Sequence, residues 1–453
     1  MHYDICTCQV SLSDPEVLDA WNQMILGFLS HGQTAPVHLG TVLERAPDFA
    51  MAHAAKGIFS LLMGRRELVA VAEAANRSAQ TALRAGGATR REQIWCAALN
   101  DWVRGYPRVA ILRMEDALRQ NRADTLSMKV SHALRFVLGD NFGMRRSVEA
   151  VIGAQGKDHP LHGYALGCLA FALEETGSYR EAERTGHMAL EFAHDDAWGL
   201  HAVAHVYDMT HRPDAGISLI ETNGAAWSHC NNFRFHVWWH KALLHLDLGD
   251  FAEVLVLYDN RIRDEKTDDY RDFSNASSLL MRLELEGVDV GDRWSELANL
   301  AETRADDGCL VFADLHYMLA LAGDSRTDAV AQMTARVTRD ALGRGDIAEV
   351  MKDPGVAAAQ GLAAFGEADF DSAFAKLRVA QPHFQRMGGS HAQRDVFERL
   401  TIEAGIRAGR LDETDALIAG RTRLRGGLPD SFAEGRMEMI AAARAQQAIV
   451  AAE

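Results

Sequence analysis

The sequence predicts an all-α fold in which helical hairpins stack into an α-solenoid, and three observations support this prediction. Alanine and leucine recur at helical spacing throughout the 453 residues, whereas alternating runs of β-branched residues are scarce. Only nine prolines interrupt this pattern. A glycine-centred turn also recurs along the chain, with a period typical of helical-hairpin repeats.

Each copy of the recurring motif has an apolar helix, a turn glycine and an alanine-rich second helix, as in AFGEADFDSAFAKLRVA. The turn glycines lie 34 to 43 residues apart, except for one interval of 72 residues. That interval divides into 34 and 38 residues if the segment THRPDAG forms a turn without glycine at His211. Because glycine adopts a left-handed backbone at little cost, we expect one just after each first helix. The turn glycines are Gly64, Gly105, Gly139, Gly177, Gly249, Gly287, Gly323, Gly366 and Gly409.

The repeat pattern suggests three parts of the chain. We expect residues 1–50 to form an N-terminal helical cap, residues 51–430 a single solenoid of about ten hairpins, and residues 431–453 a C-terminal helix. In each hairpin the first helix is expected to face inward and the second to cover it. The first helices would then line a concave pocket of the superhelix.

Several segments resemble known repeat proteins. In GSYREAERTGHMAL, Tyr179, Ala182 and Ala189 lie where the tetratricopeptide repeat has an aromatic and two small packing residues. Longer segments resemble the tetratricopeptide repeat protein 38 family, a set of degenerate-repeat proteins that includes bacterial members. The segments are GFLSHGQTAPVHLGTVLERAPDFAMAHAAKGIFSLLMG, HAVAHVYDM, FHVWWHKALLHLDLGDFAEVLVLYD and GGSHAQRDVFERL. The resemblance implies a tetratricopeptide-like solenoid, but it implies no reaction and no catalytic residue.

Composition excludes several classes of function. The net charge of −16, without a compensating basic run, argues against a nucleic-acid partner. The sequence has no apolar stretch of about 20 residues and no secretory signal, so we expect no membrane association and a cytoplasmic protein with free thiols. Phosphate-loop, nucleophile-elbow and dinucleotide fingerprints are absent, which argues against nucleotide-dependent phosphoryl transfer and dinucleotide redox chemistry.

Histidines and tryptophans gather on one face of two predicted first helices. One helix reads AWGLHAVAHVYDM, and the other lies in SHCNNFRFHVWWHKALLHL, where His236 and His240 are four residues apart. Such spacing places side chains on one side of a helix. The residues on these faces are Trp198, His201, His205, Asn232, His236, Trp239 and His240.

Polar residues also mark three later first helices. They are Asn275, Arg282, Asp314, His391, Arg394 and Asp395. Asp314 lies inside an otherwise apolar helix, so it needs a partner or a polar cavity, because burying an unpaired carboxylate is costly. Ser390 is expected to cap the last of these helices, with Arg394 and Asp395 forming an ion pair at its start.

The interpretation we favour is an enzyme of the hydrolase or lyase type with a small polar ligand in an internal cavity. Catalysis would use general acid–base chemistry or metal-activated water. The candidate catalytic residues are His201, His205, His236, His240, Asp314 and Asp395. The candidate ligand-binding residues are Trp198, Asn232, Trp239, Asn275, Arg282, His391 and Arg394.

Other interpretations of the same residues stay open. A divalent metal on His201, His205, His236 and His240 is the one cofactor that the spacing allows, but histidine pairs arise by chance in a chain with nineteen histidines. The tryptophans can be packing residues. The inner faces can instead hold a peptide segment, as in a protein-binding scaffold without catalysis, and a homo-oligomer is also compatible with the sequence.

Overall fold

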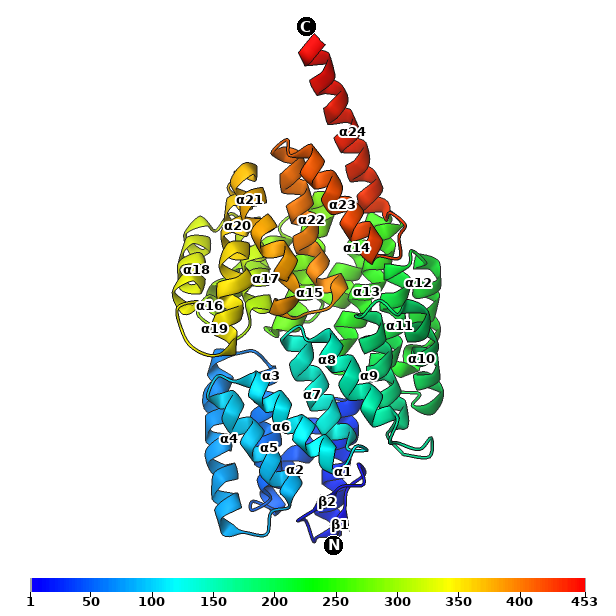
Figure 1. Cartoon of the computed structure of the whole chain (residues 1–453), viewed down its shortest axis with the longest axis vertical. Helices are drawn as coiled ribbons and strands as arrows, with labels where there is room; N and C mark the ends of the chain where they lie inside the picture. The colour runs from blue at the N-terminus through cyan, green and yellow to red at the C-terminus, as the bar shows by residue number, and fades with distance from the viewer. Residues whose placement is uncertain (1, 453) are drawn as a thin grey trace. The chain divides into compact units, whose positions relative to one another are not determined.

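The structure, a computed structural model, describes residues 2–452, the last two by their backbone alone, and these residues are almost entirely helical (Figure 1). The chain forms two compact units. The first contains Met1–Val203, Glu221–Arg234 and Arg344–Ile347, and the second contains Ala204–Ile220, Phe235–Gly343 and Ala348–Glu453. Four helices of the described chain, at residues 197–209, 213–222, 233–247 and 346–350, contain residues of both units.

The first unit is a series of helix pairs that follows a short antiparallel ribbon of β1 (His2–Tyr3) and β2 (Gln9–Val10). Each odd-numbered helix packs on its successor, and first helices also pack on each other, as α3 does on α5 and α7 does on α9. The helices are α1 (Pro15–Leu29), α2 (Ala35–Arg45), α3 (Ala50–Leu62), α4 (Arg66–Ala85), α5 (Arg90–Val103), α6 (Pro107–Gln120), α7 (Thr125–Val137), α8 (Asn141–Ile152), α9 (His162–Glu174), α10 (Tyr179–Phe192) and the short 3-10 turn η1 (Gly224–Ala226).

The second unit continues the pattern, with α15 packed on α17 and on α22, and α17 packed on α20. Its helices are α12 (Pro213–Thr222), α13 (Phe233–Asp247), α14 (Phe251–Leu257), α15 (Tyr270–Leu285), α16 (Arg293–Arg304), α17 (Val311–Gly323), α18 (Thr327–Asp340), α19 (Asp346–Val350), α20 (Val356–Gly366), α21 (Phe370–Ala380), α22 (His391–Arg407), α23 (Leu411–Leu424) and α24 (Ser431–Ala452). The short turns η2 (Tyr258–Ile262), η3 (Met351–Gly355) and η4 (Gln381–Met387) adjoin α14, α20 and α21. Helix α11 (Ala197–Met209) is continuous through the point where the first unit ends and the second begins.

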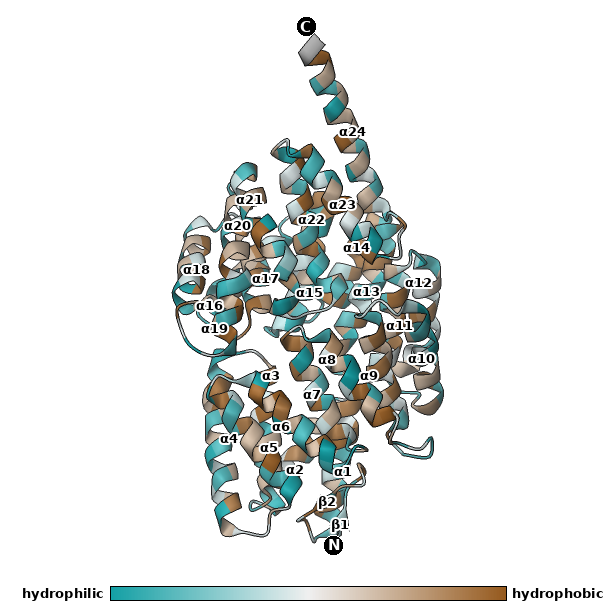
Figure 2. Cartoon of the chain, viewed as in Figure 1, coloured by the Kyte–Doolittle hydropathy of each residue, from teal (hydrophilic) through white to brown (hydrophobic). Residues whose placement is uncertain are grey.

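First and second helices of a pair differ in burial, because the first helix faces inward and the second covers it. Nearly every residue of α9 is buried, from His162 to Glu174. Helix α10 buries one stripe, and the predicted packing residues Ala182 and Ala189 lie in it. Figure 2 shows the same mixture of hydrophobic and hydrophilic residues on α4, whose buried side is a row of alanines. The prediction of an all-α helical-repeat solenoid is therefore confirmed, whereas the predicted three-part division stays a prediction.

The turns confirm most of the expected glycines. Positive φ angles occur at Gly64, Gly105, Gly139, Gly177, Gly249, Gly287 and Gly409, and His211 adopts the left-handed backbone in the turn that lacks glycine. The prediction is wrong for Gly323 and Gly366, which end α17 and α20 as helical residues; Ser325 and Ala368 take the left-handed position instead. Gly323 is needed for packing, because an added Cβ would lie 2.6 Å from the ring of Trp294.

Helix α24 is the longest helix of the described chain and has few neighbours. Its first turns pack on α22 and α23, and the rest extends past them (Figure 1). None of the helices within residues 2–452, α24 included, combines the length and the apolar character that crossing a membrane requires.

Candidate functional site

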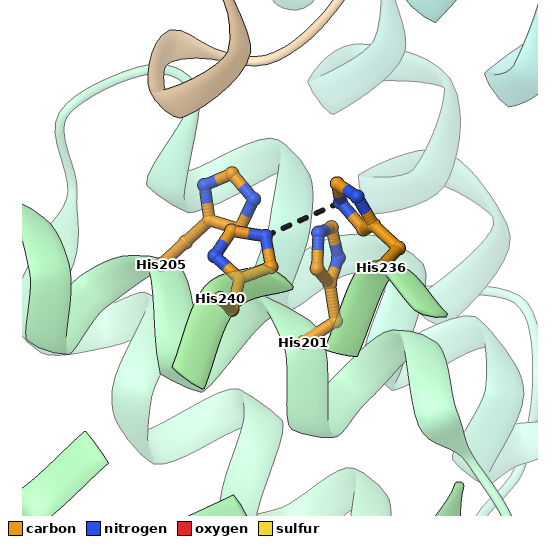
Figure 3. A group of neighbouring side chains, drawn as sticks. All are labelled: His201, His205, His236 and His240. Carbon is orange, nitrogen blue, oxygen red and sulfur yellow. Dashed lines mark hydrogen bonds between the residues drawn. The ribbon is translucent and has the colours of Figure 1, made fainter. Parts of the chain in front are cut away.

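Three histidines of the second unit form a cluster between α11 and α13. His205 comes from α11, and His236 and His240 come from successive turns of α13 (Figure 3). The Nε2 atoms of His236 and His240 are 3.2 Å apart, and the rings of His205 and His240 have centroids 4.4 Å apart. One nitrogen from each of the three rings lies within 4.8 Å of the others. The helical spacing recognised in the sequence therefore brings three imidazoles together.

His201 lies on the same helix as His205, one turn earlier. A spacing of four residues along α11 places both imidazoles on one side of that helix, as Figure 3 shows. His201 also stacks on Phe171 of α9, with ring centroids 5.5 Å apart and planes 19° apart. It is the fourth imidazole of the group that was predicted from the sequence.

Asn275 of α15 fixes the orientation of one of the three rings. Its Oδ1 is 2.9 Å from Nδ1 of His236. Because an amide oxygen can only accept, His236 must donate the proton of Nδ1, and its Nε2 then carries a lone pair. Asn275 was predicted to bind ligand, which stays a prediction; the structure shows it hydrogen-bonded to His236, in the manner of residues that orient metal-binding imidazoles.

Burial keeps these imidazoles uncharged. It lowers the pKa of His236 to about 4, although the hydrogen bond that His236 donates to Asn275 acts in the opposite direction. Burial, and then the neighbouring histidines, also place the pKa of His205 and of His240 well below the ordinary value. The residues His391 and Arg394 of α22 contribute to the shift at His205. At neutral pH the cluster therefore presents neutral nitrogens, the form of histidine that binds metal ions.

Trp239 and Arg282 border the cluster. The Trp239 ring stacks on His236 with centroids 5.2 Å apart, and its Nε1 has no hydrogen-bond partner among the described residues. The Arg282 guanidinium lies 5.6 Å from the centre of that ring and donates to the Ala392 carbonyl at 2.6 Å. Burial lowers the pKa of Arg282 to about 9, against the attraction of Asp395. These two predicted ligand-binding residues do lie beside the histidines.

The two predicted carboxylates belong to ion pairs and not to the histidine cluster. Asp314 pairs with Arg336 of α18 at 2.7 Å, so the partner that its burial demanded is an arginine of the outer helix. Burial nevertheless raises the pKa of Asp314 to about 6. Asp395 pairs with Arg399 and Arg421, at 2.7 and 2.6 Å. The expected pair of Arg394 with Asp395 is wrong, because Arg399, one turn further along α22, and Arg421 of α23 pair with that carboxylate instead.

Ser390 caps the N-terminus of α22, as the sequence predicted. Ser390 accepts from the Gln393 amide, and Gln393 returns a bond to the Ser390 amide, which completes a capping box. Arg394 donates to the Gly389 carbonyl and lies 3.3 Å from Nδ1 of His391. His391 and Arg394 therefore hold the turn that opens α22, and their role in binding a ligand stays a prediction.

Two further predicted residues belong to the first unit. Trp198 lies in a cluster of aromatic rings that includes Phe171 and Phe233, with centroids 4.7 and 5.6 Å away. Asn232 was placed on the face of a helix, but α13 begins one residue later, at Phe233. The side chain of Asn231 accepts from the Phe233 amide there, so the chain turns before the helix starts.

The sequence reasoning overlooked Lys129 and His132, which lie deep in the first unit on α7. Both are buried, at 5 % and 1 % exposure. A signal was present in SMKVSHALRFVLG, where a lysine and a histidine three residues apart interrupt an apolar first helix. The same polar interruption of an apolar helix had identified Asp314.

Comparison with known proteins adds little to this description. No known family model matches the chain. The crystal structure of yeast Tom70 is 12 % identical, covers 95 % of this chain and 88 % of its own, and has a TM-score of 0.39. The structure of Naa15/Naa10 bound to HypK-THB is 13 % identical, with a TM-score of 0.24, and its match covers 90 % of this chain and 64 % of that chain. Sequence identities and TM-scores this low support no inference about function. The proposed function therefore rests on the histidine cluster.

Proposed function

We propose that the second unit binds a divalent transition-metal ion of the zinc class through His205, His236 and His240, and that the ion activates water for a hydrolase or lyase reaction. The observation that carries this proposal is the convergence of three neutral imidazoles from two helices. Imidazole nitrogen is a preferred ligand of zinc, and catalytic zinc sites commonly use three protein ligands and one water.

The spacing within the cluster suits such an ion. A zinc–nitrogen bond of about 2.05 Å puts two ligands of a tetrahedral site about 3.3 Å apart. The Nε2 atoms of His236 and His240 are 3.2 Å apart, so they can act as two ligands without a change of the backbone. The Asn275 hydrogen bond already selects the tautomer of His236 whose Nε2 is unprotonated.

Three neutral ligands favour activation of water over a purely structural role. His205, His236 and His240 would hold the ion without neutralising it, so its full charge would act on bound water and would lower the pKa of that water toward neutrality.

The groups beside the histidines point to a small polar substrate. Trp239 offers a buried indole N–H that no described residue engages, and Arg282 offers a buried positive charge next to the same ring. A substrate oxygen could accept from both groups, since a buried donor left without a partner destabilises the protein.

Metal analysis tests the proposal directly. Purified full-length protein is titrated with zinc and, separately, with cobalt(II), whose visible absorption reports nitrogen coordination. We expect one ion per chain, and a loss of at least 100-fold in affinity for His236→Ala and for His240→Ala. His245→Ala is the matched control, because His245 lies on α13 but pairs with Asp250 outside the cluster.

The result can also exclude the metal. If the unaltered protein binds neither ion, or if His240→Ala binds as tightly as the original, the cluster is a packing feature. The protein is then better described by the alternative raised by the sequence, a peptide- or protein-binding repeat scaffold without catalysis.

A further inference from the structure

The first unit contains a second group of buried polar side chains, separate from the histidine cluster of the second unit. Lys129 and His132 lie on successive turns of α7, Cys168 lies on α9, and Trp198 lies on α11. Lys129 places its Nζ 4.5 Å from the centre of the Trp198 ring, and the His132 ring is 5.7 Å from the same ring. Two nitrogen-bearing side chains, Lys129 and His132, therefore converge on the indole of Trp198.

Lys129 is a buried cation without a counter-ion in contact. Its Nζ has one hydrogen-bond neighbour among the described residues, the Sγ of Cys168 at 3.7 Å, and a thiol is a weak acceptor. No described carboxylate lies within 4 Å of it. Lys129 acts electrostatically on the carboxyl group of Asp196, but burial raises the pKa of that carboxyl to about 7, so its negative charge is incomplete at neutral pH. An ammonium in this position is costly unless a bound anion compensates it.

Two neutral donors beside Lys129 are also unused. Neither ring nitrogen of His132 has a hydrogen-bond partner among the described residues, and the same holds for Nε1 of Trp198. Both side chains are at least nine-tenths buried, at 1 % and 9 % exposure. Burial, and then the positive charges of Lys129 and Arg135, hold the pKa of His132 well below its usual range, so the ring carries one donor and one acceptor. Buried polar groups in native proteins nearly always have partners.

Aromatic rings surround these donors and reach the surface. His31 stacks on Phe233 with centroids 4.4 Å apart, and both are half-buried. Phe136 is also half-buried and contacts Phe171 at 5.7 Å. The polar nitrogens thus lie behind an apolar rim, an arrangement suited to a ligand with an anionic end and a flat or apolar body.

We propose that the first unit binds a small monocarboxylic acid, with its carboxylate among Lys129, His132 and Trp198 and its apolar part against the rings of His31, Phe136 and Phe233. The carboxylate supplies acceptors for the ammonium and for the indole N–H, which are the groups that the fold leaves without partners. Its charge balances that of Lys129. The site uses none of the three proposed metal ligands, so it stands independently of the proposed metal-dependent function.

Calorimetric titration of the full-length protein with benzoate tests this site. We expect benzoate to bind with one equivalent per chain, and benzamide, a neutral molecule of the same shape, to bind at least tenfold more weakly. Lys129→Met keeps the length of the side chain without its charge, and it should weaken benzoate binding at least tenfold. Lys241→Met is the control, because Lys241 is an equally buried lysine over another indole, that of Trp238, and should leave binding unchanged.

A second variant keeps the test decisive if Lys129→Met does not fold. Trp198→Phe retains a ring but lacks the N–H group, and it should bind benzoate several-fold more weakly while its circular dichroism stays helical. The proposal is overturned if the original protein binds no benzoate, if benzamide binds equally well, or if both variants bind as tightly as the original. It is also overturned if a short peptide with a free C-terminal phenylalanine binds more tightly than benzoate, since the site would then be one for peptide ends.

Discussion

At the scale of single residues, Asn275 is the side chain whose role is easiest to separate from metal ligation itself. Asn275→Leu removes the acceptor for Nδ1–H of His236 while keeping a side chain of similar size. We expect zinc affinity to fall about 10- to 100-fold, the usual effect of losing such an orienting partner. Competition with a chelator of known affinity measures the change.

The control for this variant lies on the same helix. Ser277→Ala alters a buried side chain of α15 that bonds only to the Ser274 carbonyl, so it should leave zinc affinity unchanged. Asn275→Asp keeps an acceptor at the same place and should bind zinc at least as tightly as the original. Equal affinities for Asn275→Leu and the original would show that the hydrogen bond does not orient a ligand.

Some contacts of the candidate site could be predicted from the sequence, and others could not. The spacing of His236 and His240 along one helix predicted their proximity, because i and i+4 neighbours meet on every helix. The approach of Asn275, from a helix that begins more than thirty residues later, depends on packing that no local pattern encodes. The pairing of Asp314 with Arg336 likewise depends on the crossing of two helices, and only the need for a partner was predictable.

At the scale of elements, some turns between helices place a residue with a Cβ in the left-handed backbone conformation that favours glycine. Ala368 has φ of 59° after α20, whereas Gly409 has φ of 72° after α22. A residue with a Cβ in the left-handed region costs about 1 kcal/mol relative to glycine. The turn after α20 therefore carries backbone strain that the turn after α22 lacks.

Exchanging the residues at these turns should give effects of opposite sign. Ala368→Gly should stabilise the protein by about 0.5 kcal/mol, since part of the relief is offset by the greater freedom of glycine in the unfolded chain. Gly409→Ala should destabilise it by about 1 kcal/mol, although an added Cβ would meet no neighbouring atom. Urea unfolding followed by circular dichroism measures both. Shifts of the same sign would contradict the assignment of strain to φ.

These turns also explain why the helices were predictable and two of the turns were not. Apolar periodicity is a local property, so it located the helix pairs. A glycine near a helix end has two explanations, a left-handed turn or a close helix contact, and the sequence does not distinguish them. Gly323 belongs to the second kind because the ring of Trp294 packs against its backbone. The left-handed residue of that turn is Ser325, two residues further along the chain.

At the scale of whole units, the second unit is held together by charged side chains as well as by its apolar helices. Arg421 of α23 pairs with Asp395 of α22 and with Asp430, which directly precedes α24. Arg425 pairs with Asp208 of α11 at 2.9 Å and with Asp430 at 3.3 Å. All of these residues are buried. The network therefore links the helix that carries His205 to the last three helices of the unit.

This network predicts a specific sensitivity to acid. Burial alone would raise the pKa of Asp430, but Arg421 and Arg425 outweigh it and hold that pKa far below the ordinary value. The unfolded chain takes up a proton near pH 4 whereas the folded chain does not, so the stability that Asp430 contributes is present above about pH 4 and is lost as the pH falls further. Asp430→Asn should therefore destabilise the protein by about 3–5 kcal/mol at pH 7, since it leaves two buried arginines undercompensated.

When urea midpoints are compared at pH 7, 5, 4 and 3.5, the difference between Asp430→Asn and the original should stay constant between pH 7 and 5 and shrink toward pH 3.5, because the unfolded original then takes up a proton at Asp430 that the folded protein does not. Asp412→Asn is the matched control: its side chain is 96 % exposed in its pair with Arg444, so its midpoint should follow the original at every pH. A constant difference across this range would mean that Asp430 supports the unit by its hydrogen bonds and not by its charge.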